Sequence, residues 1–214
     1  VAPPPHTVEA CAEDLEALAG HLGTPPRVIV GHSFGGKVAL AAAARRPPGL
    51  EQVWSLDAIP APVPPALQAG AGPLEVIAVI RRVATPQPSR GALIAALQGQ
   101  GLDAGVAQWL STNLRRVDGG FDWSVDVDAA EAMIHDYFAR DLWGPVEAAD
   151  PAAPDVEVVR AGRSDRWSPD ILHRFDALPP GAVGRLHLLP DAGHWLHVDD
   201  PDGLLAILLD HWAR

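Results

Sequence analysis

Apolar residues recur along this chain in two rhythms, one typical of helices and one of buried strands. From Thr7 they are spaced alternately three and four residues apart through Leu22, which predicts one face of a helix. Gly23 and the pair Pro25-Pro26 end that helix. The stretch 27–30 is then predicted as a strand, because it is apolar after Arg27, as expected for a parallel strand covered on both faces.

The same reading predicts three more strands, at 53–57, 156–161 and 185–189. Helices are expected after the first strand, at 169–178 and at 203–212. Strands that alternate with helices through right-handed crossovers build a parallel sheet, so the fold class is α/β. In such sheets ligands bind beyond the carboxyl ends of the strands.

Residues 67–147 differ from the rest, because helical patterns dominate and no strong strand pattern appears. We expect helices at 74–82, 91–97, 104–114 and 128–142. This predicts an all-helical cap inserted after the second strand. The domains are then a core of residues 1–66 and 148–214 and a cap of residues 67–147, with a loose proline-rich lead-in at 1–5.

The segment after the first strand carries the strongest chemical signal. Gly31, Ser33 and Gly35 spell G-x-S-x-G between an apolar strand and an alanine-rich helix. A sharp strand-to-helix turn of this kind strains the serine backbone, and small residues on either side avoid Cβ clashes. The serine hydroxyl then stands clear as a nucleophile, and the Phe34 N–H points toward a developing oxyanion.

A serine nucleophile needs a base and a group that orients the base. His194, in the loop after the last strand, is the expected base. Asp57 follows the second strand and Asp165 follows the third, so either carboxylate could orient His194 from the same sheet edge. The sequence pattern leaves the two aspartates as competing candidates.

Composition narrows the function classes. The 214 residues are 48% hydrophobic and 20% charged, as in an ordinary globular protein of one core. The net charge of −11 disfavours nucleic-acid partners and anionic membrane surfaces. Cys11 is the only cysteine, so neither an internal disulfide nor a cysteine-based metal site is expected, and its amphipathic setting suggests a buried inert thiol. No membrane-spanning run or signal peptide is seen, and we expect a cytoplasmic location, or an organelle in a plant or alga.

These motifs resemble the α/β-hydrolase superfamily and, within it, the small YbfF-type acyl esterases and their mitochondrial relatives. The resemblance covers nearly the whole chain from Thr7 onward. The segments that carry it are Gly31–Lys37, Leu56–Pro60, Trp109–Leu114 and Ala192–His197.

The resemblance implies hydrolysis of small acyl esters or thioesters through a Ser-His-Asp triad, with no metal or organic cofactor. The subfamily places its acid at the position of Asp57, and the superfamily at large at the position of Asp165. We expect Asp165, with Asp57 as the competitor. Aromatic residues of the cap and its borders would line an apolar acyl pocket, although packing explains any one of them equally well: Trp109, Trp123, Phe138 and Trp143, with Phe121 and Tyr137.

Members of this superfamily begin with further strands and a His-Gly loop that supplies a second oxyanion donor, and this sequence starts after them. We therefore expect an N-terminally incomplete α/β-hydrolase fold with weak turnover. The bare edge of the first strand would favour self-association.

Two functions of other classes remain open. One is a cofactor-free haloperoxidase or lyase of the same fold, which activity on an ester panel would distinguish. The other is a binding module with little turnover. A dehalogenase is disfavoured, because it would need aspartate in place of Ser33.

Overall fold

The computed structural model describes residues 4–68 and 72–212, and it divides the chain into two compact units. One unit comprises residues 7–63 and 136–214, and the other residues 1–6 and 64–135. We call the first the core unit and the second the inserted unit, and each is described by itself. The expected lead-in lies partly outside the described residues, at positions 1–3.

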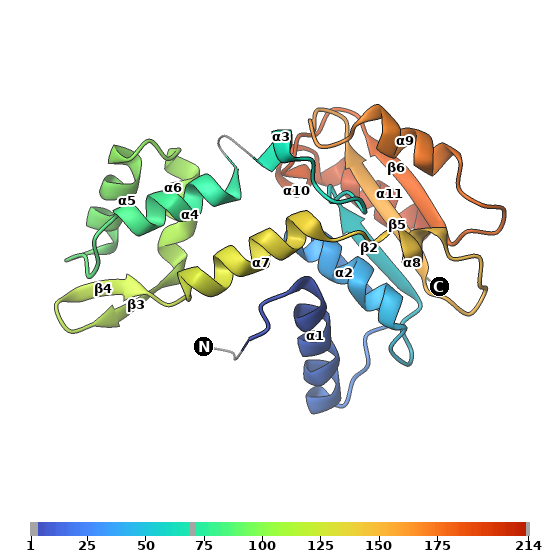
Figure 1. Cartoon of the computed structure of the whole chain (residues 1–214), viewed down its shortest axis with the longest axis horizontal. Helices are drawn as coiled ribbons and strands as arrows, with labels where there is room; N and C mark the ends of the chain where they lie inside the picture. Colours follow the sequence, from blue (N-terminus) through green and yellow to red (C-terminus); the bar gives the residue numbers. More distant parts are fainter. Residues whose placement is uncertain (1–3, 69–71, 213–214) are drawn as a thin grey trace. The chain divides into compact units, whose positions relative to one another are not determined.

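The core unit contains a parallel sheet (Figure 1). Among the described residues it has four strands in the order β1-β2-β5-β6. Their bounds are Val28–His32, Gln52–Leu56, Asp155–Ala161 and Gly184–Leu189. All three pairings are parallel, which confirms the α/β class and the four predicted strands.

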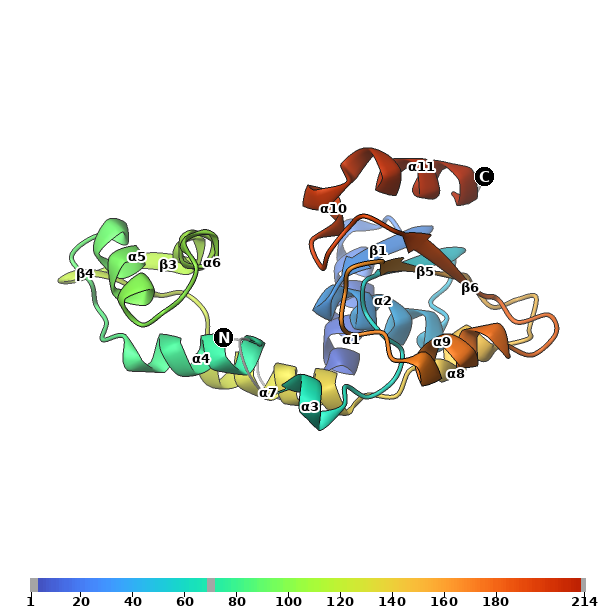
Figure 2. The same cartoon turned by 90° about the horizontal axis from the view of Figure 1, so that it is seen from above.

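Helices cover both faces of this sheet (Figure 2). On one face lie α1 (Val8–Leu22), α2 (Phe34–Arg45), α8 (Trp143–Glu147) and α9 (Pro169–Asp176). On the other lie α10 (Leu196–Asp199) and α11 (Pro201–His211). Apolar side chains of the two central strands and of β6 pack against Leu196 and Leu204 there, so β2 and β5 are buried on both sides.

Local signals in the sequence account for the ends of α1. The Thr7 hydroxyl accepts a hydrogen bond from the N–H of Ala10 and caps the first turn. Gly23 ends the helix at φ 66°, a left-handed conformation that glycine adopts without a Cβ penalty. Cys11 is only half-buried on this helix, and burial raises the pKa of its thiol, with Asp14 and Asp136 adding to the shift.

The inserted unit has its own apolar core and is not all-helical. Its helices are α3 (Pro65–Gln68), α4 (Pro73–Arg82), α5 (Arg90–Gly99), α6 (Ala104–Leu110) and the short η1 (Ser111–Asn113), and α7 (Val127–Ala139) leads back to the core unit. The core of this unit includes Leu93 and Leu97 of α5 and Leu110 of α6, all buried.

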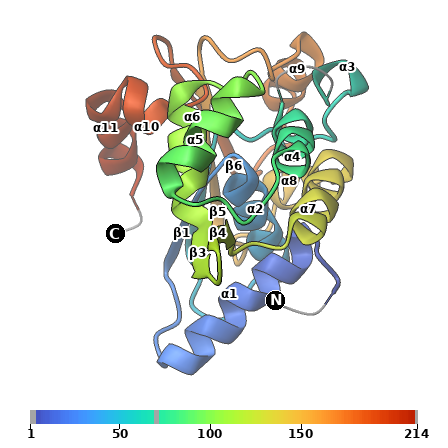
Figure 3. The same cartoon turned by 90° about the vertical axis from the view of Figure 1, so that its left-hand side faces the viewer.

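A β-hairpin corrects the all-helical prediction for this unit. Strands β3 (Leu114–Val117) and β4 (Gly120–Trp123) pair antiparallel and lie beside α5 and α6 (Figure 3). The helix expected over 104–114 therefore stops at Leu110. The turn passes through Gly119 and Gly120, both at positive φ, and Leu114 and Trp123 point into the apolar core.

Strand β1 is an edge of the described sheet. Val30 is 45% exposed on it, and Leu18 and Leu22 of α1 are also exposed. Beside the strand a hollow of about 290 Å³ is lined by Leu15, Ala19, Pro26, Ile29, Ala42 and Pro48, among others. Within the described ranges, no helix combines the length and apolar character needed to cross a membrane.

Candidate active site

Ser33 stands in the strained turn that the sequence pattern predicts. Its backbone has φ 54° and ψ −114°, between the end of β1 and the first residue of α2. A Cβ on Gly31 would come within 1.9 Å of the Gly35 carbonyl oxygen, so glycine is required there. A Cβ on Gly35 meets nothing within 4 Å, whereas one on Gly36 would come within 2.6 Å of Ala58 Cβ. On the helix side, the position that has no room for a Cβ is therefore Gly36, not Gly35.

Asp57 occupies a matching position one strand away. It follows β2, has φ 46° and is completely buried. Its Oδ1 accepts hydrogen bonds from the Trp167 indole N–H at 2.7 Å and from the Ala161 N–H at 3.1 Å. Both donors fix the carboxylate and leave its second oxygen to face His194.

His194 bridges Ser33 and Asp57. Its Nδ1 lies 2.8 Å from Asp57 Oδ2, and its Nε2 lies 3.1 Å from Ser33 Oγ. Because an ionised carboxylate only accepts, Nδ1 carries the proton in the neutral ring and Nε2 is free to accept the serine proton. This is the nucleophile–base–orienter arrangement that activates a serine.

The Asp57 carboxyl stays ionised despite its burial. Burial alone raises its pKa, but hydrogen bonds from His194, Trp167 and Ala161 favour the charged form and bring the pKa below its ordinary value. An ionised Asp57 is what an imidazolium at His194 would need as its partner.

Asp165, which the sequence analysis preferred, lies elsewhere. It sits in an exposed turn after β5, and among the described residues no hydrogen bond or ion pair joins it to His194. The geometry differs from the sequence-based preference because Trp167, two residues along the same loop, turns inward and binds the competing carboxylate.

The loop that carries His194 is held from both sides. The His32 Nε2–H donates to the His194 carbonyl oxygen at 2.7 Å, and the Asp199 carboxylate accepts from the Gly193 N–H at 2.8 Å. The rings of His32 and His194 lie 4.7 Å apart. Burial lowers the pKa of His32, which favours its neutral form.

Phe34 and Tyr137 form the other side of the Ser33 environment. Phe34 opens α2, and the first N–H groups of a helix have no acceptor within the helix, so its N–H is available to an oxyanion. The rings of Phe34 and Tyr137 lie 6.0 Å apart. Burial raises the pKa of the Tyr137 hydroxyl, and the charge of Arg166 and a side-chain hydrogen bond with Ser33 partly offset that shift.

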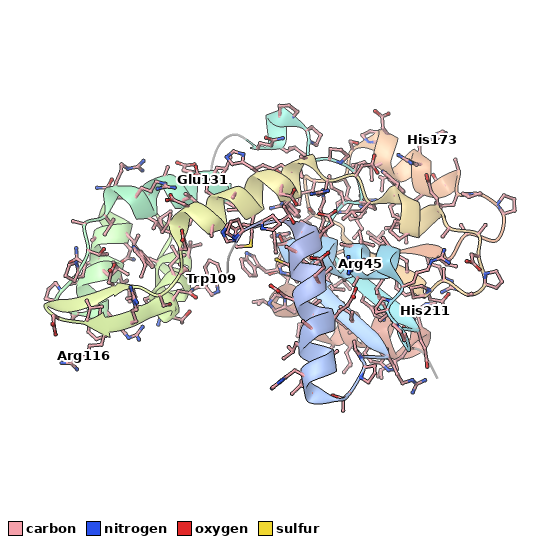
Figure 4. The ribbon with its side chains drawn as sticks, turned by 60° about the horizontal axis from the view of Figure 1, so that its bottom comes forward. Arg45, Trp109, Arg116, Glu131, His173 and His211 are labelled. Carbon is pink, nitrogen blue, oxygen red and sulfur yellow. The ribbon has the colours of Figure 1, made fainter. Side chains whose placement is uncertain are left out.

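The four aromatic residues expected to bind substrate fall into different surroundings. Phe138 is buried with its ring 5.7 Å from that of Tyr137. Trp143 is buried, with its ring 4.8 Å from that of Phe175. In the inserted unit, Trp123 belongs to the apolar core, and Trp109 is 56% exposed (Figure 4). A substrate-binding role for these four stays a prediction.

A second hollow, of about 180 Å³, is separate from this site. It lies at the carboxyl end of α2, where Ala43, Arg46 and Pro145 are among its lining residues, whereas Ser33 precedes the amino end.

The sequence profile of the alpha/beta hydrolase family matches residues 2–207. The chain belongs to this family. This alpha/beta hydrolase is 30% identical over 207 residues to the sn-1-specific diacylglycerol lipase ABHD11 of Mus musculus, a match that covers 94% of the chain and 64% of the lipase. It is 27% identical over 198 residues to esterase YbfF of Escherichia coli K12, covering 92% of the chain and 71% of the esterase. Both matches bear out the predicted resemblance.

Among solved structures, a marine microorganism esterase superposes with a TM-score of 0.75 at 22% identity, covering 97% of this chain and 79% of that one. This likeness confirms the α/β-hydrolase fold. The chain spans less than two thirds of the length of the mouse lipase.

Sequence reasoning about this alpha/beta hydrolase missed Trp167 and His32 as parts of the site. Trp167 did carry a signal, because an indole N–H needs an acceptor when it is buried. His32 occupies the variable position of the G-x-S-x-G motif, and nothing in the pattern indicated its contact with the carbonyl of His194.

Proposed function

We propose that this alpha/beta hydrolase is a serine hydrolase that cleaves carboxylic ester or thioester bonds of small acyl substrates. Ser33 is the nucleophile, His194 the general base and Asp57 the orienting acid. The observation that carries the proposal is the continuous pair of contacts from Ser33 Oγ to His194 Nε2 and from His194 Nδ1 to Asp57 Oδ2. The names of the relatives, a lipase and an esterase, favour ester hydrolysis.

In the first half of the reaction, Ser33 Oγ attacks the acyl carbonyl carbon while His194 Nε2 takes the hydroxyl proton. The Phe34 N–H donates to the oxyanion that forms. Asp57 stabilises the imidazolium through Nδ1–H. The intermediate then collapses, the carbon–oxygen or carbon–sulfur bond breaks, and His194 returns the proton to the leaving alcohol or thiol.

In the second half, water attacks the acyl group on Ser33. His194 now takes a proton from that water, and the oxyanion again meets the Phe34 N–H. Collapse releases the carboxylic acid, and the proton held by His194 restores the Ser33 hydroxyl. Water is the second reactant of this half.

A fluorophosphonate probe tests the nucleophile. We expect the probe to label wild-type protein on Ser33, as mapped by mass spectrometry of the labelled peptide. Ser33→Ala should abolish both labelling and hydrolysis of p-nitrophenyl butyrate. The matched control is Ser168→Ala, at the amino-terminal cap of α9, which should label normally. Labelling that persists in Ser33→Ala would refute the assignment.

We further infer that the chain self-associates through the edge of β1. The support is threefold: Val30 is exposed on a parallel edge strand, its neighbour Ile29 lines the apolar hollow, and Leu18 and Leu22 of α1 are exposed. An edge of this kind presents unpaired backbone groups beside apolar surface, which favours pairing with a second copy.

A further inference from the structure

Lys37 has an unusual place in this protein. It is the only lysine of the chain, and all the other side chains in the Lys+Arg total of 16 are arginines. It lies on α2, four residues after Ser33, and is completely buried. A buried ammonium group is costly unless hydrogen bonds satisfy it, so its retention here calls for an explanation.

Three backbone carbonyls satisfy this ammonium group. The Lys37 Nζ donates to the carbonyl oxygens of Ala61, Tyr137 and Arg140, each at 2.8 Å. A lysine ammonium has three N–H donors on a compact centre, so each donor has one acceptor. The planar fork of an arginine could not meet three convergent acceptors in the same way.

These carbonyls belong to the two segments that connect the core unit with the inserted unit. Ala61 lies just before residue 64, where the chain enters the inserted unit, and Tyr137 and Arg140 follow residue 135, where the chain returns. The same two segments are joined by backbone hydrogen bonds, from Val63 N–H to Phe138 at 2.8 Å and from Leu142 N–H to Pro60 at 2.7 Å. Lys37 attaches this pair of segments to the helix that follows the nucleophile.

Tyr137 links Lys37 to the surroundings of Ser33. Lys37 Nζ also lies 4.8 Å from the centroid of the Tyr137 ring, within the range of a cation–π interaction. The same ring packs near Phe34 at 6.0 Å, and its hydroxyl is close to Ser33. The backbone and the ring of Tyr137 are therefore both held by one side chain.

We propose that Lys37 is a positioning residue for the hydrolase centre, acting through Tyr137. By binding both connecting segments, it fixes the Tyr137 ring against Phe34 and beside Ser33, where the acyl group must enter. The inference rests on the proposed hydrolase function. A misplacement of about 1 Å near the reacting atoms costs about 10²-fold in rate, so a residue that touches no substrate can still govern turnover.

Enzyme kinetics normalised to active sites tests this role. Lys37→Met keeps the length of the side chain and removes the ammonium group. Turnover of p-nitrophenyl butyrate per fluorophosphonate-labelled site should fall at least about tenfold, towards about 10²-fold. A purely structural lysine would change only the number of folded sites. The control is Arg45→Met, which removes a cation from the same helix at a surface ion pair with Glu13 and Glu16 and should keep turnover (Figure 4).

A double-mutant cycle tests the route. If Lys37 acts through Tyr137, adding Lys37→Met to the Tyr137→Leu variant should lower turnover by less than about threefold, because the effects of coupled residues are not additive. Unchanged turnover per labelled site in Lys37→Met would overturn the positioning role. An equal loss in both backgrounds would overturn the route through Tyr137.

Spectroscopy separates this inference from the proposed function. Protein labelled with ¹⁵N-lysine has a single lysine side-chain resonance, because the chain has one lysine. At pH 6 we expect slowly exchanging ammonium protons, whether or not the protein hydrolyses esters. A signal that exchanges as fast as that of a solvent-exposed lysine would overturn the three-carbonyl contact on its own.

Discussion

Replacing Asp57 by asparagine should separate the two candidate acids of this hydrolase. The carboxylate accepts from His194 Nδ1 at 2.8 Å through one oxygen, and from Trp167 and Ala161 through the other. Asparagine keeps one acceptor oxygen, which can stay with Trp167 and Ala161, and then turns its NH₂ group toward His194. Nδ1 must become the acceptor, so the proton moves to Nε2, which can no longer accept from Ser33.

The expected loss follows from this change of tautomer. A triad whose histidine is held in the wrong tautomer loses about 10⁴ in kcat, or about 5.4 kcal/mol at about 1.36 kcal/mol per tenfold change. Alanine would be a less clean replacement, because each buried donor left unpaired costs a further ~1–3 kcal/mol of stability. The matched control is Asp165→Asn, on an exposed turn, where a surface substitution changes the free energy of unfolding by no more than about 0.5 kcal/mol, so turnover should be kept.

The assay is hydrolysis of p-nitrophenyl butyrate, with kcat expressed per fluorophosphonate-labelled site and thermal unfolding followed by circular dichroism. Asp57→Asn should remain folded and lose turnover, while Asp165→Asn should retain it. If Asp57→Asn keeps more than about a tenth of wild-type kcat, the tautomer argument fails. A large loss in Asp165→Asn would restore the acid that the sequence favoured.

Two further results are expected. Burial lowers the pKa of Lys37 from 10.5 to about 7; Asp141 and Asp136 oppose the shift, and Arg140 adds to it. Above pH 7, Lys37 therefore binds more protons in the unfolded chain than in the folded protein, so unfolding becomes less favourable as the pH rises. We compare the free energy of unfolding in urea between wild type and Lys37→Met. The difference, wild type minus variant, should rise by about 2 kcal/mol from pH 7 to pH 9 and should not change below pH 7. A difference that is the same at every pH would contradict this prediction. In light scattering after size-exclusion chromatography, the chain should be a dimer or larger, and Val30→Lys, on the exposed edge of β1, should convert it to monomer, unlike Leu209→Lys on exposed α11. A monomeric wild type would exclude the edge pairing.

The periodic elements could be predicted because their patterns are long or fully buried. The four strands were found within one or two residues, and α1 begins at Val8, one residue after the start of its predicted pattern at Thr7. The β3–β4 hairpin was missed because each strand has four residues, too few for an alternation to stand out. Leu114 continued the helical spacing of the preceding residues, and only the packing of Leu114 and Trp123 into the inserted unit assigns them to strands.

Two residues of the candidate site could also be predicted from the sequence. Ser33 and His194 follow from a motif and a position at the sheet edge, both of which are local. The choice between Asp57 and Asp165 is not local, because it depends on which loop side chain turns inward. Trp167 does so and binds Asp57, leaving Asp165 in solvent. No spacing in the sequence encodes that inward turn.

Ser33 and Asp57 have the same kind of backbone turn at the ends of neighbouring strands, and this explains why both contact His194. β1 and β2 run parallel with His32 opposite Leu56, so Ser33 and Asp57 each stand one residue beyond the paired segment. The ladder continues through both residues, since the Ser33 N–H donates to Leu56 at 2.9 Å and the Asp57 N–H donates to Val159 at 2.8 Å.

Immediately after that last ladder bond, both residues turn to positive φ, at 54° and 46°. Such conformations cost about 1–3 kcal/mol each and persist only where the surroundings fix them. Here the fixing elements are the central strands, β2 and β5, which are buried on both faces. The sheet therefore fixes Ser33 and Asp57, the proposed nucleophile and acid, and the loop of His194, braced by His32 and Asp199, completes the proposed alignment.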